Sequence, residues 1–305
     1  MASASNWSKL SEEIAEAVER AGKSVVAVQS RHRHASSGVV WQSDVVVTSD
    51  HTTRRDGELA VVLEGGKSVA ATVAGRDPTT DIAVLRLAAA SNLSNAVFAE
   101  TADIRVGRIV AAVARSQRGN LLASSGILSG VMGAWRTWHG GEIDRFIRPD
   151  LTMYPGFSGG ALIDSSGQLL GINTTGLRRG SCITIPPETL KRVVDELLAK
   201  GHIARPYLGL AMQPVQIPES LQSKQNLTNQ TGLLIVHVEP NGPAEQAGLL
   251  VGDIIAGFGG GAPEELFEIR QVLHGKRIGD KFDVSILRGG ARTRVVVSVG
   301  ERPVG

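Results

Sequence analysis

A serine enclosed by glycines is the segment of this sequence whose residue types point most directly to chemistry. Residues 155–160 read PGFSGG, and the glycines around Ser158 allow a tight turn whose backbone N–H groups converge on one point. Such a turn can hold a nucleophile and an oxyanion hole, and Gly156 leaves space for a substrate carbonyl. Hairpin loops have the same composition, so a catalytic interpretation requires a base elsewhere in the chain.

His51 is the histidine best placed to be that base. It follows the apolar run 45–48 within three residues, so a buried strand would deliver it rigidly to the edge of a cleft. His32 and His34 lie in a polar stretch typical of a solvated loop, with no identifiable partners for a metal ion. His237 lies in an expected strand with no acid placed to orient it. Three further histidines lie near glycines in expected loops: His139, His202 and His274.

A carboxylate must hold the imidazole in the tautomer that accepts a serine proton. Asp81 meets this need, because it stands at the start of the apolar run 82–85, which can bury it beside His51. Asp50 is adjacent to the histidine in the chain and badly placed to reach its ring. Asp77 precedes a proline and is typical of a turn.

The elements that position these residues are predicted to be mostly strands. At about 150 residues per typical domain, a length of 305 residues predicts two domains. The 42% hydrophobic and 20% charged residues are typical of a folded globular chain. The 36 glycines and abundant β-branched residues favour a turn-rich β fold. Basic and acidic residues number 32 and 30 and are scattered, so nucleic acid is not an expected partner.

Short apolar runs separated by glycine, proline and polar clusters predict an antiparallel barrel or sandwich between residues 24 and 185. The clearest expected strands are residues 24–28, 44–48, 59–63, 82–87 and 109–113. Residues 190–197 change to helical spacing, and Gly201 follows as a stop signal. The first 22 residues predict an amphipathic helix.

Beyond residue 206 the pattern predicts a small α+β module of about a hundred residues. Its expected strands are residues 233–238, 254–258, 281–287 and 293–299, and its expected helices are 243–247 and 263–273.

The sequence gives little sign of a membrane or an oxidising compartment. No run approaches the roughly 20 apolar residues that span a bilayer. Acidic residues occupy the place of a signal peptide's apolar core, so the chain as it stands is expected to be cytoplasmic. A periplasmic or other extracytoplasmic location is the alternative if a leader has been removed. Cys182 is the single cysteine and is interpreted as a small buried residue rather than a reactive thiol.

Four motifs in one order resemble the HtrA (Deg) branch of the chymotrypsin-fold serine proteases. They are residues 48–51 (TSDH), 80–85 (TDIAVL), 156–160 (GFSGG) and 171–174 (GINT). The likeness runs from about residue 24 to residue 199 and continues into the C-terminal module. Each motif alone is weak, but their shared order and spacing make the set specific.

The resemblance implies roles for the residues already singled out. Ser158 would be the nucleophile, His51 the general base and acid, and Asp81 the orienting carboxylate. The N–H groups of Gly156 and Ser158 would form the oxyanion hole. The implied fold is a double barrel of two six-stranded barrels, with the site between them and no metal or cofactor.

The resemblance also implies an organisation and partners. The expected parts are an N-terminal helix over residues 1–22, a protease domain over 23–200, a linker over 201–206 and a PDZ domain over 207–305. Such a protein would be an ATP-independent endopeptidase acting on unfolded proteins or peptides, and members of the family are typically homotrimers.

The C-terminal module resembles a PDZ domain. Its expected carboxylate-binding loop is Tyr207-Leu208-Gly209-Leu210, and residues 239–248 and 252–255 match the core signature of that family. A loop of this kind offers N–H groups to a peptide C-terminus, and the adjacent strand edge pairs with the peptide. Without the downstream match, an ordinary buried strand would explain the same four residues.

The resemblance extends to substrate specificity. The residue six before the nucleophile lies at the base of the S1 pocket in chymotrypsin-like enzymes, and here it is Thr152. A lysine or arginine side chain would enter without a buried partner, so cleavage after small or medium apolar residues is expected. The other residues expected to line the pocket are Ile172, Asn173, Thr174, Cys182, Ile183 and Thr184.

The chain departs from the family pattern beside the nucleophile. The family usually has asparagine where Tyr154 and Phe157 stand, and proline where Ala161 stands. Because Phe157 lies inside the oxyanion turn, the turn is expected to be altered or to need activation. A catalytically silent, peptide-binding or chaperone-like protein is therefore the alternative function. A further hypothesis makes the PDZ domain an allosteric switch across the short linker.

Overall fold

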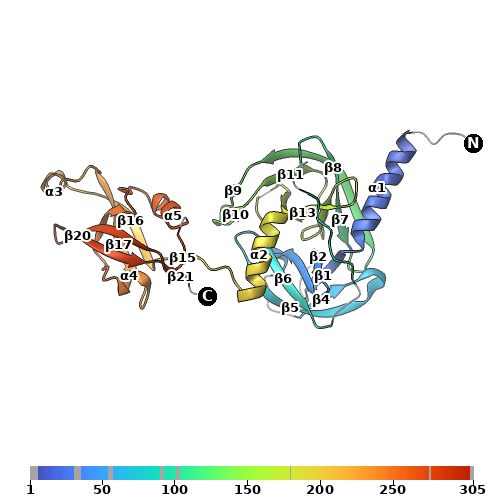
Figure 1. Ribbon diagram of the computed structural model, residues 1–305, viewed down its shortest axis with the longest axis horizontal. Coiled ribbons are helices and arrows are strands. Elements are labelled where there is room, and N and C mark those ends of the chain that lie inside the picture. The colour runs from blue at the N-terminus through green and yellow to red at the C-terminus, as the bar shows by residue number, and fades with distance from the viewer. Residues whose placement is uncertain are drawn as a thin grey trace, which may run out of the picture. The chain divides into compact units, whose positions relative to one another are not determined.

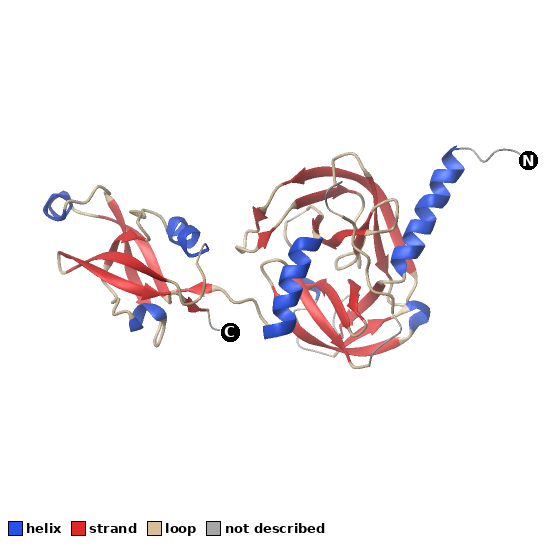
Figure 2. Ribbon diagram, viewed as in Figure 1, coloured by secondary structure: helices blue, strands red, loops and turns tan. Residues whose placement is uncertain are grey.

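The computed structural model describes residues 6–30, 36–53, 58–89, 93–100, 104–178, 180–274 and 276–302. The chain forms two compact units, Met1–Ile203 and Ala204–Gly305 (Figure 1). Strands dominate both units and helices are few, which confirms the mostly β prediction (Figure 2).

The first unit begins with a closed six-stranded barrel of order β1-β2-β3-β6-β5-β4, in which every neighbouring pair is antiparallel. Its strands are β1 (Val25–Ser30), β2 (Ser36–Gln42), β3 (Val45–Ser49), β4 (Leu59–Val62), β5 (Ser68–Asp77) and β6 (Ile82–Leu87). β3 is buried throughout. Val46 packs in the core of this barrel, whereas Val45 and Val47 join the larger cluster that also includes residues of the second barrel. A strand buried on both faces explains the continuous apolar run before His51.

A second closed barrel follows, with order β11-β14-β13-β12-β7-β8. Its strands are β7 (Ile109–Arg115), β8 (Leu121–Met132), β11 (Phe146–Asp150), β12 (Ala161–Ile163), β13 (Leu169–Thr174) and β14 (Ile183–Ile185). A small hairpin of β9 (Trp135–Arg136) and β10 (Glu142–Ile143) extends from the β8–β11 connection. The two barrels confirm the expected chymotrypsin-like architecture.

Two α-helices and two short 3₁₀ segments also lie among the described residues of the first unit. α1 (Asn6–Gly22) lies on the second barrel against β7 and β12, with Ala17 and Ala21 as its buried residues beside Gly22. α2 (Pro187–Lys200) packs on β5 and β6 and ends at Gly201, whose φ is 79° and whose N–H donates to the Leu197 carbonyl. The stop at Gly201 is thus confirmed. The 3₁₀ segments are η1 (Asp50–Thr52) and η2 (Glu64–Gly66).

The second unit has its own core and a five-stranded antiparallel sheet of order β16-β17-β18-β19-β20. The sheet strands are β16 (Leu210–Gln216), β17 (Thr231–Val238), β18 (Ile254–Phe258), β19 (Lys281–Arg288) and β20 (Ala291–Ser298). β15 (Pro206–Tyr207) pairs with β21 (Gly300–Glu301). The helices are α3 (Glu219–Gln225), α4 (Pro243–Gln246) and α5 (Leu266–His274). Within the described ranges of both units, no helix has the length and apolar character needed to cross a bilayer.

Candidate active site

His51 is held by the end of a buried strand. It lies in η1, directly after β3, and the hydroxyls of Thr52 and Thr53 donate to the carbonyls of Ser49 and Asp50, which closes the turn. The N–H of Asp50 donates to the Asp81 carbonyl at 3.1 Å. These contacts fix the backbone of the histidine, while its side chain keeps 27% of its surface exposed. The ring is therefore positioned rigidly and still accessible from outside.

Asp81 binds His51 at two points. Its Oδ1 accepts the His51 backbone N–H and its Oδ2 faces the ring Nδ1, each at 2.8 Å. The Thr174 hydroxyl donates to the same Oδ2. The carboxylate is 2% exposed and its residue has a φ of 59°, a left-handed conformation that aspartate tolerates better than most residues. An ionised carboxylate can only accept a hydrogen bond, so Nδ1 carries the proton in this contact and Nε2 is left as the ring's acceptor.

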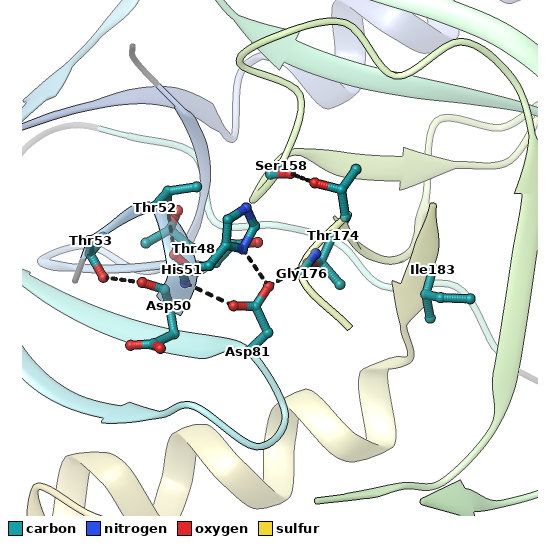
Figure 3. Close-up of polar contacts among 12 residues, drawn as sticks. Thr48, Asp50, His51, Thr52, Thr53, Asp81, Ser158, Thr174, Gly176 and Ile183 are labelled. Carbon is teal, nitrogen blue, oxygen red and sulfur yellow. Dashed lines mark hydrogen bonds and ion pairs between the residues drawn. The ribbon is translucent and has the colours of Figure 1, made fainter. Parts of the chain in front are cut away.

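Ser158 comes from the other barrel, in the turn between β11 and β12. The N–H of Phe157 donates to the Tyr154 carbonyl at 3.1 Å, and that of Gly160 donates to the Phe157 carbonyl at 3.0 Å. The turn needs glycine at 159, where φ is 83° and a Cβ would lie 2.0 Å from the Ser37 carbonyl oxygen. Figure 3 shows the imidazole of His51 between the Asp81 carboxylate and Ser158.

Two backbone N–H groups of this turn remain without a hydrogen-bond acceptor among the described residues. They belong to Gly156 and Ser158, whereas those of Phe157, Gly159 and Gly160 all have carbonyl partners. Gly156 has a φ of 95°, so no side chain stands in the way of this conformation. Two N–H donors beside a serine hydroxyl are what an oxyanion hole requires.

Three consecutive residues at the C-terminal end of β13 contact the side chains of Asp81, Ser158 and His51. Thr174 donates to Asp81, the Thr175 hydroxyl lies 3.1 Å from Ser158 Oγ, and Gly176 packs against the His51 ring. The Gly176 N–H in turn donates to the Thr174 hydroxyl at 2.9 Å (Figure 3). Sequence reasoning assigned Thr174 to a pocket wall and missed its neighbours, since nothing local in a Thr-Thr-Gly sequence indicates such contacts.

Phe157 does not face the substrate side of the turn. Its side chain is 2% exposed and packs with Ala112 and Ala114 in the second barrel. The ring of the half-exposed Tyr154 lies 5.7 Å from its ring. The side chain that departs from the family pattern is thus accommodated in the core, and the turn around it retains its hydrogen bonds.

Five of the seven predicted pocket residues lie on the paired strands β13 and β14, and all five are buried. Asn173 faces Thr184 across β13 and β14, and Thr174 faces Ile183. The Asn173 side chain is fully engaged, because its amide donates to the Ala161 carbonyl and its oxygen accepts the Thr184 hydroxyl at 2.8 Å. Ile172 is buried too, whereas Thr152 is exposed. A role of these residues in substrate selection stays a prediction.

Cys182 is buried just before β14. Its Sγ lies 3.8 Å from the Asn173 side-chain oxygen. Burial raises the pKa of the thiol to about 12, against a smaller lowering by a backbone hydrogen bond from Thr174. The thiolate that reactive cysteines use is therefore scarce at neutral pH.

The other candidate acids and bases lie elsewhere. Asp50 is fully buried with its Oδ1 3.6 Å from Arg76 Nε, and Asp77 accepts hydrogen bonds from Thr79 and Thr80 as a turn residue does. The expectation that His237 lacks an acid is wrong, because Glu239 lies 3.2 Å from its Nε2 on the exposed side of β17. Residues two apart in a strand share a face, so the strand predicted for residues 233–238 was enough to indicate this pair. His32 and His34 lie outside the described residues.

In the second unit, the predicted loop connects β15 to β16. Leu208 is buried and its carbonyl accepts the N–H of Ala244, while Gly209 has a φ of 77° and accepts the N–H of Glu239. β16 begins at Leu210 and is the edge strand of the five-stranded sheet. The loop is held by these two backbone hydrogen bonds, and β16 is at the edge of the sheet. A fixed loop and an edge strand are the two parts that β-augmentation requires.

Comparison with known proteins agrees with both units. Residues 36–172 match the family model described as a trypsin-like peptidase domain, and residues 206–299 match the one described as a PDZ domain. The double barrel and its site thus place the first unit in the class of trypsin-like peptidase domains.

Curated relatives and solved structures give the family. The "Serine protease Do-like HtrA" of Lactobacillus helveticus is 35% identical over 274 residues, 83% of this chain and 65% of that relative. The protein of the same name from Bacillus subtilis is 32% identical over 278 residues, 84% of this chain and 61% of its own length. A structure titled "HtrA-type protease AlgW with decapeptide" has a TM-score of 0.68 and 26% identity, covering 96% of this chain and 99% of that one. The serine endoprotease from Yersinia pestis has a TM-score of 0.69 and 27% identity, covering 95% and 98%.

The chain therefore has a trypsin-like peptidase domain followed by a PDZ domain, and it is homologous to HtrA and DegP-like proteases. It spans less than two thirds of the length of the two curated relatives named above.

Proposed function

We propose that the chain is an ATP-independent serine endopeptidase that cleaves unfolded or misfolded proteins. One observation carries the proposal: the Asp81 carboxylate holds the His51 ring by Nδ1 at 2.8 Å, with Ser158 on the other side of the ring. The names of the relatives, which are serine proteases, support it.

The proposed mechanism uses only groups of this chain. Ser158 Oγ attacks the scissile carbonyl while its proton passes to Nε2 of His51, and Asp81 stabilises the imidazolium that forms. The N–H groups of Gly156 and Ser158 bind the oxyanion. The imidazolium then protonates the leaving amine, and a water molecule activated by the same histidine hydrolyses the acyl-enzyme. No step requires a metal, and no group of three or more potential ligand side chains occurs among the described residues.

The hydroxyls of Ser158 and Thr175 share one hydrogen bond in which either can be the donor, and when Ser158 donates it must leave this contact before it can transfer its proton. That contact is 3.1 Å long, and Thr175 is exposed, so a bound substrate can replace it. Exchange of this single weak hydrogen bond costs about 1 kcal/mol. The resting arrangement is therefore compatible with turnover.

We further propose cleavage after small or medium apolar residues. The side chains of β13 and β14 that were assigned to the pocket carry no charge, and Thr152 is uncharged as well. An entering lysine or arginine would lose hydration without gaining an acid partner, which costs several kcal/mol. Peptide esters ending in valine, alanine, lysine or arginine test this order, and faster turnover of the basic esters would contradict it.

The second unit is proposed to bind protein C-termini. The terminal carboxylate would be held by the N–H groups of residues 207–210, and the peptide would pair with the free edge of β16. A labelled peptide with a free apolar C-terminus is expected to bind, and the same peptide with an amidated C-terminus is the matched control. Equal affinity for both would exclude carboxylate recognition. The family also leads us to propose a homotrimer, which native mass spectrometry checks.

Replacing Ser158 with alanine tests the peptidase function. Casein degradation should fall by orders of magnitude, because the nucleophile is removed. The wild-type protein should also react with a fluorophosphonate probe, whereas the S158A and H51A variants should not. A wild-type protein that stays unlabelled, with or without C-terminal peptide and unfolded protein, would instead identify a silent peptide-binding or chaperone-like protein.

A further inference from the structure

Ser37 lies directly beneath the oxyanion turn. It is fully buried in β2 of the first barrel, whereas the turn belongs to the second barrel. Its backbone N–H donates to the Ser158 carbonyl at 3.0 Å, and its hydroxyl donates to the Gly156 carbonyl at 2.8 Å. One residue thus holds the carbonyl groups of the two residues whose N–H groups would bind the oxyanion.

Holding these two carbonyls constrains the N–H groups of the turn. Peptide groups are planar, so each bound carbonyl fixes a whole peptide plane. The peptide that carries the Ser158 N–H lies between the two planes that Ser37 fixes, and the peptide that carries the Gly156 N–H directly precedes the first of them. The direction of both donors therefore depends on the support from Ser37.

The hydroxyl of Ser37 is itself fixed by a second contact. It accepts the backbone N–H of Arg115 at 3.0 Å, so it serves as donor and acceptor at once and has a defined orientation. The Ser37 carbonyl accepts a hydrogen bond from the Thr48 hydroxyl at 2.6 Å. Thr48 lies in β3, three residues before His51, which lies in η1. The same residue thereby links the turn to the segment that carries the histidine.

Arg115 anchors this support to the rest of the unit. Its side chain is 4% exposed, and its guanidinium donates to the carbonyls of Gly22, Val25 and Gly119 at 2.6 to 2.7 Å. Gly22 is the last residue of α1, where helix carbonyls lack partners and favour a cation. Three carbonyl acceptors compensate for much of the burial of this charge, although burial still lowers the pKa of Arg115.

We propose that Ser37 is a positioning residue of the oxyanion hole, which acts through the Gly156–Ser158 backbone and without contact to the substrate. The inference rests on the proposed peptidase function. It assigns a role in catalysis to the hydroxyl of a serine 119 residues away in the chain from the carbonyl that it holds. Loss of the hydroxyl would leave the buried Arg115 N–H without its partner and would remove the donor that holds the part-buried Gly156 carbonyl, so the turn would be free to rotate.

The test compares Ser37→Ala with Ser36→Ala in the full chain. Ser36 is the preceding residue of β2, buried to a similar degree at 4% exposed, and makes no side-chain hydrogen bond among the described residues. On a peptide ester, S37A should lower kcat by about 10- to 100-fold and leave KM within about twofold, because the support acts on the transition state. S36A should leave both constants within about twofold.

A tripeptide aldehyde ending in valine supplies a readout that a purely structural role would not move. It forms a hemiacetal whose oxygen occupies the oxyanion hole, so its affinity for S37A should fall in proportion to kcat. The matching tripeptide alcohol forms no such adduct and should bind S37A and the wild-type protein with equal affinity. Circular dichroism and the thermal midpoint establish that the variants are folded.

Unchanged kcat and aldehyde affinity in a folded S37A variant would overturn the inference. If S37A does not fold, Ser37→Cys carries the same test, since a thiol of similar size is a weaker donor and should lower kcat by about 10-fold. Wild-type kcat and aldehyde affinity in S37C would then overturn it. A wild-type protein that neither labels nor cleaves would instead refute the peptidase function, so the two failures are distinguishable.

Discussion

Gly176→Ala should disable the proposed active site without unfolding the protein. A Cβ at this position would lie 2.6 Å from His51 Nδ1 and 2.7 Å from Asp81 Oδ2, the two atoms that share the orienting hydrogen bond. Side-chain carbons essentially never approach a neighbour this closely. The φ of Gly176 is not in the left-handed region, so the effect of alanine here is purely steric.

The size of the effect follows from the distances. Ordinary contact begins at 3.4 Å, so the methyl group and Nδ1 must separate by at least 0.8 Å, from 2.6 to 3.4 Å. If the ring moves by that much, the His51–Asp81 bond opens from 2.8 Å toward about 3.6 Å, where it no longer acts as a hydrogen bond. If residues 174–176 move instead, the hydrogen bonds of Thr174 with Asp81 and of Thr175 with Ser158 are broken. Loss of the orienting carboxylate costs up to about 10⁴-fold in kcat in related triads, so we expect a fall of about 10²- to 10⁴-fold.

The assay is kcat on a peptide ester, with the rate of fluorophosphonate labelling as a second measure. Gly133→Ala is the matched control, since a Cβ there meets nothing within 4 Å and its φ is not positive. The thermal midpoint should change by only a few degrees in both variants. A folded G176A variant with kcat within about threefold of wild type would refute the reasoning, because the triad would then tolerate the methyl group without displacement.

Three further predictions concern groups outside the triad. Cys182 should resist a thiol-specific disulfide reagent at pH 8 in the native protein and react after denaturation, because a pKa of about 12 leaves about 10³-fold less thiolate than a free thiol has. Burial alone would raise the pKa of Asp144, but hydrogen bonds from Thr189 and Arg192 outweigh it and lower the pKa, so ionised Asp144 stabilises the fold above about pH 4. This contribution is lost as the pH falls through the lowered pKa; Asp144→Asn should therefore lower the thermal midpoint by about 1 to 2 °C at pH 7 and have no effect near pH 2. Arg115→Met should lower the free energy of unfolding by about 3 kcal/mol in denaturant titrations, because the carbonyls at the end of α1 and its neighbours lose a charged donor.

The sequence pointed to the three residues of the proposed triad because each of them borders a local signature. His51 and Asp81 adjoin buried apolar strands, and Ser158 lies among glycines that a tight turn requires. The order of these signatures carried the family resemblance that implied the double barrel, whereas the strand pattern alone predicted a barrel or a sandwich. Their mutual contacts, by contrast, depend on the packing of two barrels against each other, which only the structure shows.

Several strands escaped prediction for a physical reason. β8 is half-exposed along most of its length, so its apolar residues follow no clear alternation. β16 contains Pro214, which argues against a central strand, and the structure places it at a sheet edge where the missing N–H is tolerated. Ser37 gave no signal either, because a buried serine in a strand acquires its role from carbonyls that are remote in the chain.

The position of Phe157 explains how a residue beside the nucleophile can depart from the family pattern. The side chain enters the core of the second barrel, where its burial contributes about 2 kcal/mol toward holding the turn. Ser37 holds the carbonyls of Gly156 and Ser158 from the first barrel. Contacts from both barrels therefore hold the turn, and hydrogen bonds to its backbone set the direction of its N–H groups. The apolar side chain at position 157 strengthens the contact of the turn with the second barrel and occupies no space in the oxyanion hole. Its presence is therefore no argument against a working nucleophile.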